Sequence, residues 1–251
     1  MKRGVRRLCI ILTVLILIEV VIYKWPDQKV SAKLKHLNDI DYYNVILSDN
    51  DKEVKPMNVP LIQQLPELPR GCEVTSLAML LRSAGVKADK IRLAQQIKKD
   101  PTPYKNVKGS VYFGDPNQGF VGNMYDKSQP GLGVYHQPIF QLAKQYLHNR
   151  VIDMTGEKFN KVEEQLSKQR PVWVITSVSE QPVPQSLWQT WHTEDGLINI
   201  TRQEHSVVLT GYDENYVYFN DPLDTVKNKR AAKKDFISVW KQFGSQAISY
   251  N

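Results

Sequence analysis

The chain has 251 residues, 41% of them hydrophobic and 24% charged, which is the composition of a folded globular protein and excludes a largely disordered one. Its formal net charge is +7, and residues 1–30 carry +4 of it, because six Lys and Arg side chains there face only two carboxylates. Since this basic excess flanks a hydrophobic run instead of forming a patch, the charge argues against nucleic-acid binding.

The hydrophobic run covers residues 8–23, is preceded by four cations and is followed by Lys24 and Trp25. This pattern predicts a membrane-spanning signal anchor over residues 1–26, with the N-terminus in the cytoplasm and the rest of the chain outside. No small-x-small cleavage pattern follows the run. An uncleaved single-pass anchor in the cell membrane is therefore favoured over secretion after cleavage.

Residues 27–56 are polar, rich in lysine and interrupted, and we interpret them as a stalk or linker. The folded domain is expected over residues 57–251. Its first helix is predicted to begin at Cys72, apolar side chains recur at helical spacing from Val74 to Ala84, and Gly85 is placed to end it.

The rest of the domain is predicted to mix short helices with strands and two long loops. The pattern favours helices over residues 89–100, 136–147, 158–169 and 235–244, a buried strand over 170–178, a hairpin over 205–222, and loops over 101–135 and 181–199. The two loops, the second with Trp188, Trp191 and His192, are expected to wall a cleft. Because helices come first and strands later, the expected fold is α+β with an antiparallel sheet.

Cys72 is the only cysteine outside the N-terminal segment, so the domain cannot form an internal disulfide. It lies in the first turn of the first predicted helix, where free N–H groups and the positive end of the helix dipole favour a thiolate. Glu73 beside it opposes the thiolate by like charge. Cys72 is therefore either a nucleophile with a cationic partner elsewhere or a buried structural cysteine.

His205 opens the first strand of the predicted hairpin and is the candidate partner, because a histidine beside a thiol accepts its proton. If residues 213–215 form a three-residue loop with Asn215 in the left-handed region, Tyr212 faces Tyr216. Asp221 then lies diagonally across from His205 on the same face, within reach of its ring. A one-residue change in register would bring Asp224 opposite His205 instead.

Other kinds of chemistry lack their motifs. The chain has no HExxH sequence or cysteine pair for a metal, no phosphate-binding glycine loop, and no serine in G-x-S-x-G. We therefore expect neither a metal nor another cofactor.

Several segments resemble, in order and spacing, the exported branch of the bacteriocin-processing (double-glycine leader) peptidase family of Gram-positive bacteria: QLPELPRGCEVTSLAMLLRSAG, GDPNQGFVGNMY, GLGVYHQPI, DMTGEKF and EHSVVLTGYDENYVYFNDP. The resemblance implies a papain-like fold, with N-terminal helices packed on a C-terminal antiparallel sheet. It also implies a triad of Cys72, His205 and Asp221, and an upstream glutamine that donates to the oxyanion. Gln64 is the preferred glutamine and Gln63 is the alternative.

The chain also departs from that family. Its leader-processing members usually have a small residue where this chain has Glu73, and they are fused to transporters that work on the cytoplasmic side. The resemblance therefore does not imply cleavage of double-glycine leaders.

The favoured hypothesis is a membrane-anchored extracytoplasmic cysteine peptidase that acts on a peptide or protein substrate outside the cell. One alternative is a catalytically silent module that binds a peptide or cell-wall component in the same cleft. Another is an acyltransferase, which would use the same three residues and pass the acyl group to an amine instead of water.

Overall fold

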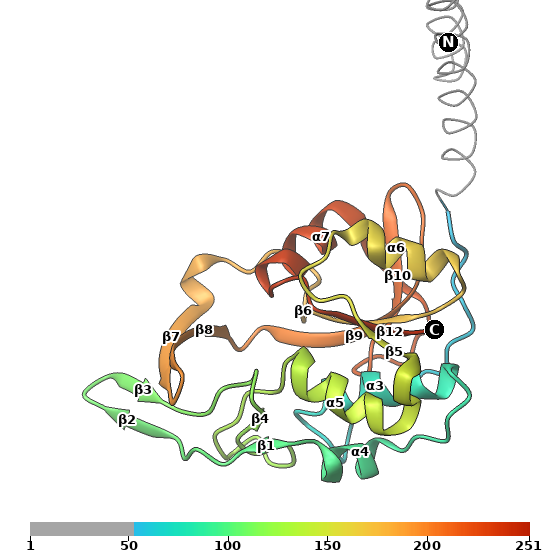
Figure 1. The fold of residues 1–251 in the computed structure, drawn as a ribbon. Helices are drawn as coiled ribbons and strands as arrows, with labels where there is room; N and C mark the ends of the chain where they lie inside the picture. The colour runs from blue at the N-terminus through green and yellow to red at the C-terminus, as the bar shows by residue number, and fades with distance from the viewer. Residues whose placement is uncertain (1–52) are drawn as a thin grey trace, which may run out of the picture. The chain divides into compact units, whose positions relative to one another are not determined.

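The computed structural model describes residues 53–251, drawn in colour in Figure 1. The predicted signal anchor over residues 1–26 and nearly all of the predicted linker lie outside the described residues. Within residues 53–251, no helix is both long and apolar enough to cross a membrane. The packed chain already includes Val54, which is buried and pairs with Tyr212, three residues before the predicted start of the domain at residue 57.

A six-stranded antiparallel sheet forms the centre of the domain, in the order β11-β10-β9-β6-β12-β5. Its strands are β5 (Val151–Asp153), β6 (Val172–Ser177), β9 (Glu204–Tyr212), β10 (Tyr216–Asn220), β11 (Lys229–Ala232) and β12 (Ala247–Tyr250). All six residues of β6 are buried, as the near-continuous apolar run over residues 170–178 predicts for a central strand.

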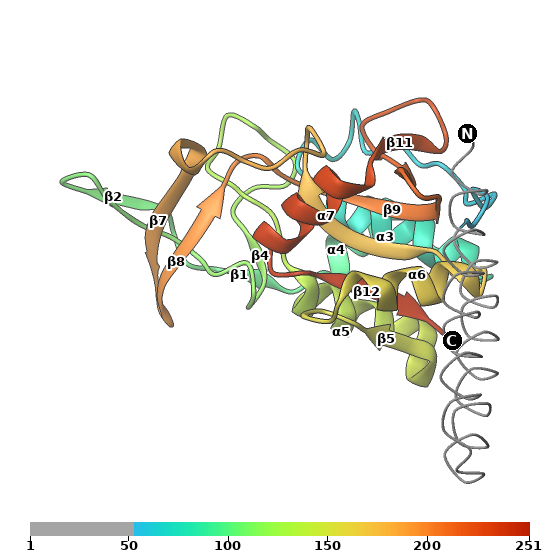
Figure 2. The ribbon, with the colours of Figure 1, turned by 90° about the horizontal axis from the view of Figure 1, so that it is seen from above.

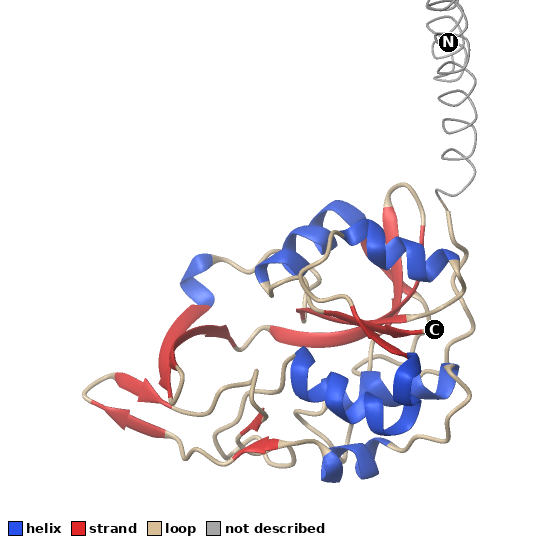
Figure 3. Cartoon of the chain, viewed as in Figure 1, coloured by secondary structure: helices blue, strands red, loops and turns tan. Residues whose placement is uncertain are grey.

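Helices cover both faces of this sheet (Figures 1 and 3). On one side lie α3 (Cys72–Ser83), α4 (Lys90–Gln96) and α5 (His136–Leu147), and on the other α6 (Phe159–Ser167) and α7 (Lys233–Gln242). The alternation along β6 shows both interfaces, because Trp173 packs with the first group and Val172 and Val174 pack with the second. The predicted α+β class, with the earlier helices packed on an antiparallel sheet, is confirmed.

Local sequence explains most helix boundaries. Helix α5 has the predicted bounds. Helix α3 buries its apolar face, and shortly after its end Gly85 has a φ of +82°, a conformation that glycine adopts readily where a helix stops. Helix α4 begins where the carboxylate of Asp89 accepts the N–H groups of Ile91 and Arg92. It ends at Gln96, earlier than predicted, because Lys99–Asp100 pair with Phe120–Val121 as the parallel strands β1 and β4.

The two predicted loops contain strands, so that part of the prediction is wrong. Strands β2 (Lys105–Val107), β3 (Ser110–Tyr112), β7 (Trp188–Thr193) and β8 (Gly196–Thr201) form a second sheet in the order β2-β3-β7-β8. In Figures 1 and 2 this sheet extends sideways from the main one. The turn between β2 and β3 carries a sequence signal, since Lys108 and Gly109 both have positive φ and glycine suits the second position of such a two-residue turn. Between β7 and β8, Thr193 pairs with Gly196, so the turn residues are Glu194 and Asp195.

The contact between α3 and β9 places the beginning of the helix against the beginning of that strand. The hydroxyl of Ser76, one turn into α3, donates to the carbonyl of Ser206 on β9 at 2.9 Å, and both residues are buried. Residues 72 and 205, far apart in the chain, are thereby brought to one place.

Candidate active site

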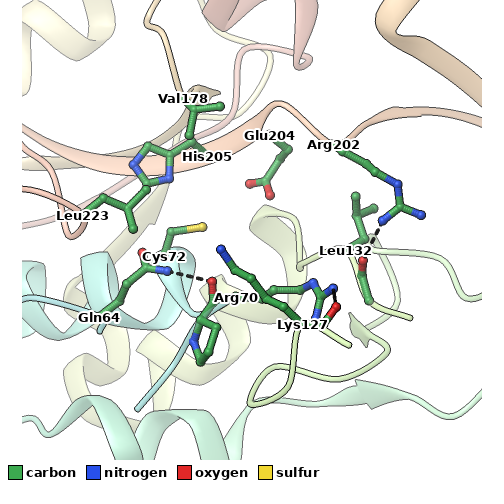
Figure 4. Close-up of a pocket in the computed structure, with 12 residues that line it drawn as sticks. Gln64, Arg70, Cys72, Lys127, Leu132, Val178, Arg202, Glu204, His205 and Leu223 are labelled. Atoms are coloured by element: carbon green, nitrogen blue, oxygen red, sulfur yellow. Dashed lines mark hydrogen bonds between the residues drawn. The ribbon is translucent and has the colours of Figure 1, made fainter. Parts of the chain in front are cut away.

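Cys72 is the first residue of α3, as predicted for the first turn of this helix. The chain enters the helix through Gly71, where an added Cβ would meet the Cβ of Leu68 at 2.5 Å, so only glycine fits the tight turn. Cys72 is 8% exposed and lines a cavity of about 180 Å³, into which its sulfur points in Figure 4.

His205, on β9, and Asp221, directly after β10, form a buried pair. The ring Nε2 of His205 lies 2.8 Å from Oδ1 of Asp221, and the two residues are 1% and 4% exposed. Burial raises the pKa of Asp221, but the hydrogen bond and charge of His205, the N–H of Leu223 and the ammonium of Lys229 together lower it to about 2. The carboxylate is thus ionised, Nε2 carries the hydrogen, and Nδ1 is left for a second partner.

The strand pairing of the hairpin differs from the predicted pairing near the turn. Near the turn Val217 pairs with Tyr212, so the expected pairing of Tyr212 with Tyr216 is wrong, and Asn215 does not have positive φ. A bulge between Tyr218 and Phe219 then shifts the register by one residue, after which Phe219 pairs with Leu209. The shift restores the predicted pairing before the strands reach His205 and Asp221.

Asp224, the alternative third residue, lies elsewhere. Its carboxylate pairs with Lys229 at 3.2 Å and accepts the N–H groups of Thr225 and Val226. Among the described residues it makes no hydrogen bond or ion pair with His205, so the geometry favours Asp221.

Of the two candidate glutamines, Gln64 lines the cavity and Gln63 has an exposed side chain. Gln64 is 2% exposed, and its Nε2 donates to the carbonyls of Leu68 and Pro69 at 3.1 and 3.2 Å. Its Oε1 atom is buried and has no hydrogen-bond partner in the part of the chain that the structure describes. For Gln64 to donate to an oxyanion, its amide must exchange at least one of these carbonyls for the substrate.

Two acidic side chains flank the thiol. Glu73 is fully buried, and its Oε1 accepts the N–H of Val134 at 2.7 Å while its Oε2 accepts the Cys72 thiol at 3.3 Å. Glu204, directly before His205, lines the same cavity, and its buried Oε1 finds no partner among residues 53–251. Gly133 packs against both carboxyls and has no room for a side chain, since a Cβ there would meet Glu73 at 2.2 Å and Glu204 at 2.9 Å.

These groups control one another's protonation. Burial raises the pKa of Glu73 to about 7, and burial and the charge of Glu73 raise that of Glu204 well above its ordinary value. Burial, together with the charges of Glu73 and Glu204, raises the pKa of Cys72. In this structure the cysteine is therefore a thiol that donates to Glu73, not a thiolate paired with His205.

Cys72, Glu73 and Glu204 offer ligand atoms within 4.8 Å of one another. Raised pKa values favour the protonated form of both buried carboxyls, which argues against a preformed cation site. The sequence identified Glu73 as a charge opposing the thiolate. It held no signal for Glu204, which joins the site only because β9 packs beside α3.

The aromatic residues of the predicted second loop do not line this cavity. Trp191 is 1% exposed and packs against Phe113 in a separate cluster, while His192 stacks on Tyr112 with ring centroids 4.5 Å apart. From the other predicted loop, Lys127 and Leu132 do line the cavity. The expectation that both loops wall the cleft therefore holds for residues 101–135 and is wrong for residues 181–199.

An α+β domain with a cysteine at the start of a buried helix, beside a histidine–carboxylate pair on the adjacent sheet, has the architecture of the papain-like superfamily. The chain belongs to the Peptidase C39-like family, whose model matches residues 56–248. It is 42% identical to the uncharacterized protein YvpB of Bacillus subtilis (strain 168) over 260 residues, 98% of each chain.

A solved structure gives the same assignment. The chain is similar to the crystal structure of a C39-like protein from Bacillus anthracis, for which peptidase activity is itself inferred. The TM-score is 0.73 and the identity 46%, over 79% of this chain and 97% of that one. The expected resemblance to bacteriocin-processing peptidases is thus confirmed at the level of the family and the fold.

Proposed function

We propose that this protein is a cysteine peptidase in which Cys72 is the nucleophile, His205 the acid and base, and Asp221 the residue that orients His205. The observation that carries the proposal is the buried pair of His205 and Asp221 beside Cys72. Because Nε2 is held by Asp221 at 2.8 Å, only Nδ1 can accept the thiol proton.

The reaction begins with a change of partner for the thiol. The Cys72 thiol gives up its hydrogen bond to Glu73 and transfers its proton to Nδ1 of His205. The resulting thiolate attacks the substrate carbonyl. The resulting oxyanion is held by the Cys72 backbone N–H at the start of α3, with Gln64 as the second donor once its amide turns toward the cavity. His205 then protonates the leaving amine, and water, activated by the same ring, hydrolyses the thioester.

We place this activity outside the cell, with residues 1–26 as the membrane anchor and a peptide or protein as substrate. The cationic flank of the hydrophobic run supports this part of the proposal. Protease accessibility of residues 53–251 on intact cells tests it, since a cytoplasmic domain would be protected until the cells are lysed.

The experiment that tests the activity compares the full-length protein with its Cys72→Ala, His205→Ala and Lys144→Gln variants in detergent. A proteome-derived peptide library is incubated with each, and new termini are identified by mass spectrometry. Cleavage is expected from the parent and from Lys144→Gln, which changes an exposed residue of α5, and is expected to be lost in the other two. Cleavage that survives in Cys72→Ala would rule out the proposed nucleophile.

One alternative has structural support. The thiol bonded to Glu73 and the Gln64 amide bonded to two carbonyls are features of a resting site, and a module that only binds peptides would keep them permanently. Peptide binding that is equal in the parent and in Cys72→Ser, with no turnover, would favour this alternative. An acyltransferase would instead show amine-capped products when an amine nucleophile is added.

A further inference from the structure

We propose that the cavity at Cys72 selects substrates with a carboxylate next to the reacting carbonyl, and that Arg202 and Lys127 bind this carboxylate. The inference rests on the proposed function for the reaction, and it adds the chemical class of substrate. It starts from three basic side chains, those of Arg70, Lys127 and Arg202, which line the same cavity as Cys72 and His205.

The three basic residues come from separate parts of the chain. Arg70 lies two residues before Cys72, Lys127 follows β4, and Arg202 connects β8 with β9. Figure 4 shows them grouped on one side of Cys72, with His205 and Leu223 on the other side. A substrate group that enters beside the thiol therefore meets positive charge on one wall only.

The two arginines are fixed in place without being neutralised. Arg70 donates to the carbonyls of Asn123, Asp126 and Lys127 at 3.0, 2.8 and 3.1 Å, and Arg202 donates to the carbonyl of Gly131 at 3.3 Å. Within residues 53–251 no carboxylate lies within 4.0 Å of the charged groups of Arg70, Lys127 or Arg202. Carbonyls hold a guanidinium in position but leave its full charge available to a ligand.

The electrostatic balance around Arg70 supports the same conclusion. Burial and the positive charge of Arg202 lower the pKa of Arg70, and Asp126 offsets this only in part. An anion bound at Arg202 offsets the repulsion between these two cations at the wall of the cavity. Guanidinium groups suit a carboxylate, because their N–H groups match its two oxygens.

The acids in the cavity do not cancel this charge. Glu204 is the one acidic residue that lines the cavity, and burial beside Glu73 raises its pKa well above the ordinary value. Near neutral pH, Glu73 and Glu204 therefore carry less negative charge than ordinary carboxylates do. The cavity then presents more positive than negative charge to an incoming group.

The test uses two alkylating reagents of similar size, anionic iodoacetate and neutral iodoacetamide. The rate of Cys72 modification by each is measured on the full-length protein by mass spectrometry of the Cys72 peptide, which separates it from Cys9. The ratio of the two rates cancels the fraction of thiolate, so it reports the charge of the cavity and not the acidity of the thiol. It is compared with the ratio for a small free thiol.

We expect the ratio for Cys72 to exceed that of the free thiol, and to fall about fivefold in each of Arg202→Gln and Lys127→Gln. High salt should also lower it, because screening weakens the attraction. The matched controls are Arg92→Gln and Lys144→Gln, which remove exposed charges on α4 and α5. A ratio equal to that of the free thiol, an equal fall in the controls, or a Cys72 that admits neither reagent would overturn the proposal.

Peptide substrates identify the source of the carboxylate. Pairs that differ only in Glu or Gln beside the cleaved bond test an acidic side chain, and pairs that end in a carboxylate or an amide test a chain terminus. The Arg202→Gln variant should raise KM for the charged member of the preferred pair. Cleavage without any charge preference would contradict the inference and leave the proposed function intact, whereas a raised reagent ratio without cleavage would contradict only the function.

Discussion

Replacing Glu73 with Gln tests the conclusion that a carboxylate keeps Cys72 protonated. The Oε2 atom of Glu73 lies 3.3 Å from the Cys72 sulfur, and its Oε1 atom accepts the N–H of Val134 at 2.7 Å. In the Glu73→Gln variant the amide oxygen keeps the bond to Val134, and the amide nitrogen then points at the sulfur. A group that repels a thiolate is thereby replaced by one that donates to it, with no change in size.

The size of the effect follows from Coulomb's law. Two unit charges at the observed separation repel by about 5 kcal/mol at an effective dielectric constant of about 20. Because about 1.4 kcal/mol changes a pKa by one unit, even half of this energy lowers the pKa of the thiol by roughly two units. At pH 8 and above, where Glu73 with its pKa of about 7 is ionised in the parent, the rate of Cys72 alkylation should therefore rise about tenfold or more, since the thiolate is the reactive form.

The assay is the pH profile of Cys72 alkylation by iodoacetamide in the parent, Glu73→Gln and Glu214→Gln, the last of which removes an exposed charge in the hairpin turn. The midpoint should shift to lower pH in Glu73→Gln and stay unchanged in Glu214→Gln. An unchanged or higher midpoint in Glu73→Gln would refute the reasoning and show that burial alone sets the acidity of the thiol.

The same substitution changes how stability depends on pH. The pKa of Glu73 is raised from 4.5 to about 7, so the folded state holds a proton that the unfolded state has lost. The parent therefore loses about 3 kcal/mol as the pH rises from 4.5 through 7. Glu73→Gln removes this loss, and urea unfolding at pH 5 and pH 8 should show the variant gaining more stability relative to the parent at pH 8 than at pH 5.

Asp221→Asn should reduce peptide turnover in a domain that still folds at neutral pH but is less stable than the parent, whereas Asp224→Asn should leave turnover unchanged; the opposite result would assign the orienting role to Asp224. The pKa of Asp221 is lowered from 3.8 to about 2, so the ionised carboxylate contributes about 2 kcal/mol of stability above pH 4, which is lost as the pH falls through 2. Acid unfolding of the parent should show this loss, and acid unfolding of Asp221→Asn should not. Gly133→Ala would place a methyl group 2.2 Å from Oε1 of Glu73, so we expect a loss of roughly 1–3 kcal/mol in urea unfolding, and an unchanged midpoint would mean that the carboxyl moves freely.

Elements that depend on neighbouring residues could be predicted from the sequence. Helix α5 matches residues 136–147 because apolar side chains at helical spacing specify both the element and the face that it buries. The hairpin of β7 and β8 lies within a predicted loop, because β7 (WQTWHT) mixes aromatic and polar residues without strict alternation. Strand β7 also pairs with β3, nearly 80 residues away, and no local pattern reveals such a partner.

The sequence by itself determined the candidate chemistry: one thiol at the start of a helix, one histidine that opens a strand, and two aspartates as possible partners. Only the tertiary structure shows that Asp221, and not Asp224, lies beside His205, because a bulge between Tyr218 and Phe219 shifts the strand register by one residue. The tertiary structure also brings Glu204 and three basic side chains, those of Arg70, Lys127 and Arg202, to the cavity that holds the thiol. Such groups come from strands and loops far apart in the chain, and they meet because burial of apolar surface, not local preference, sets where α3 and β9 lie.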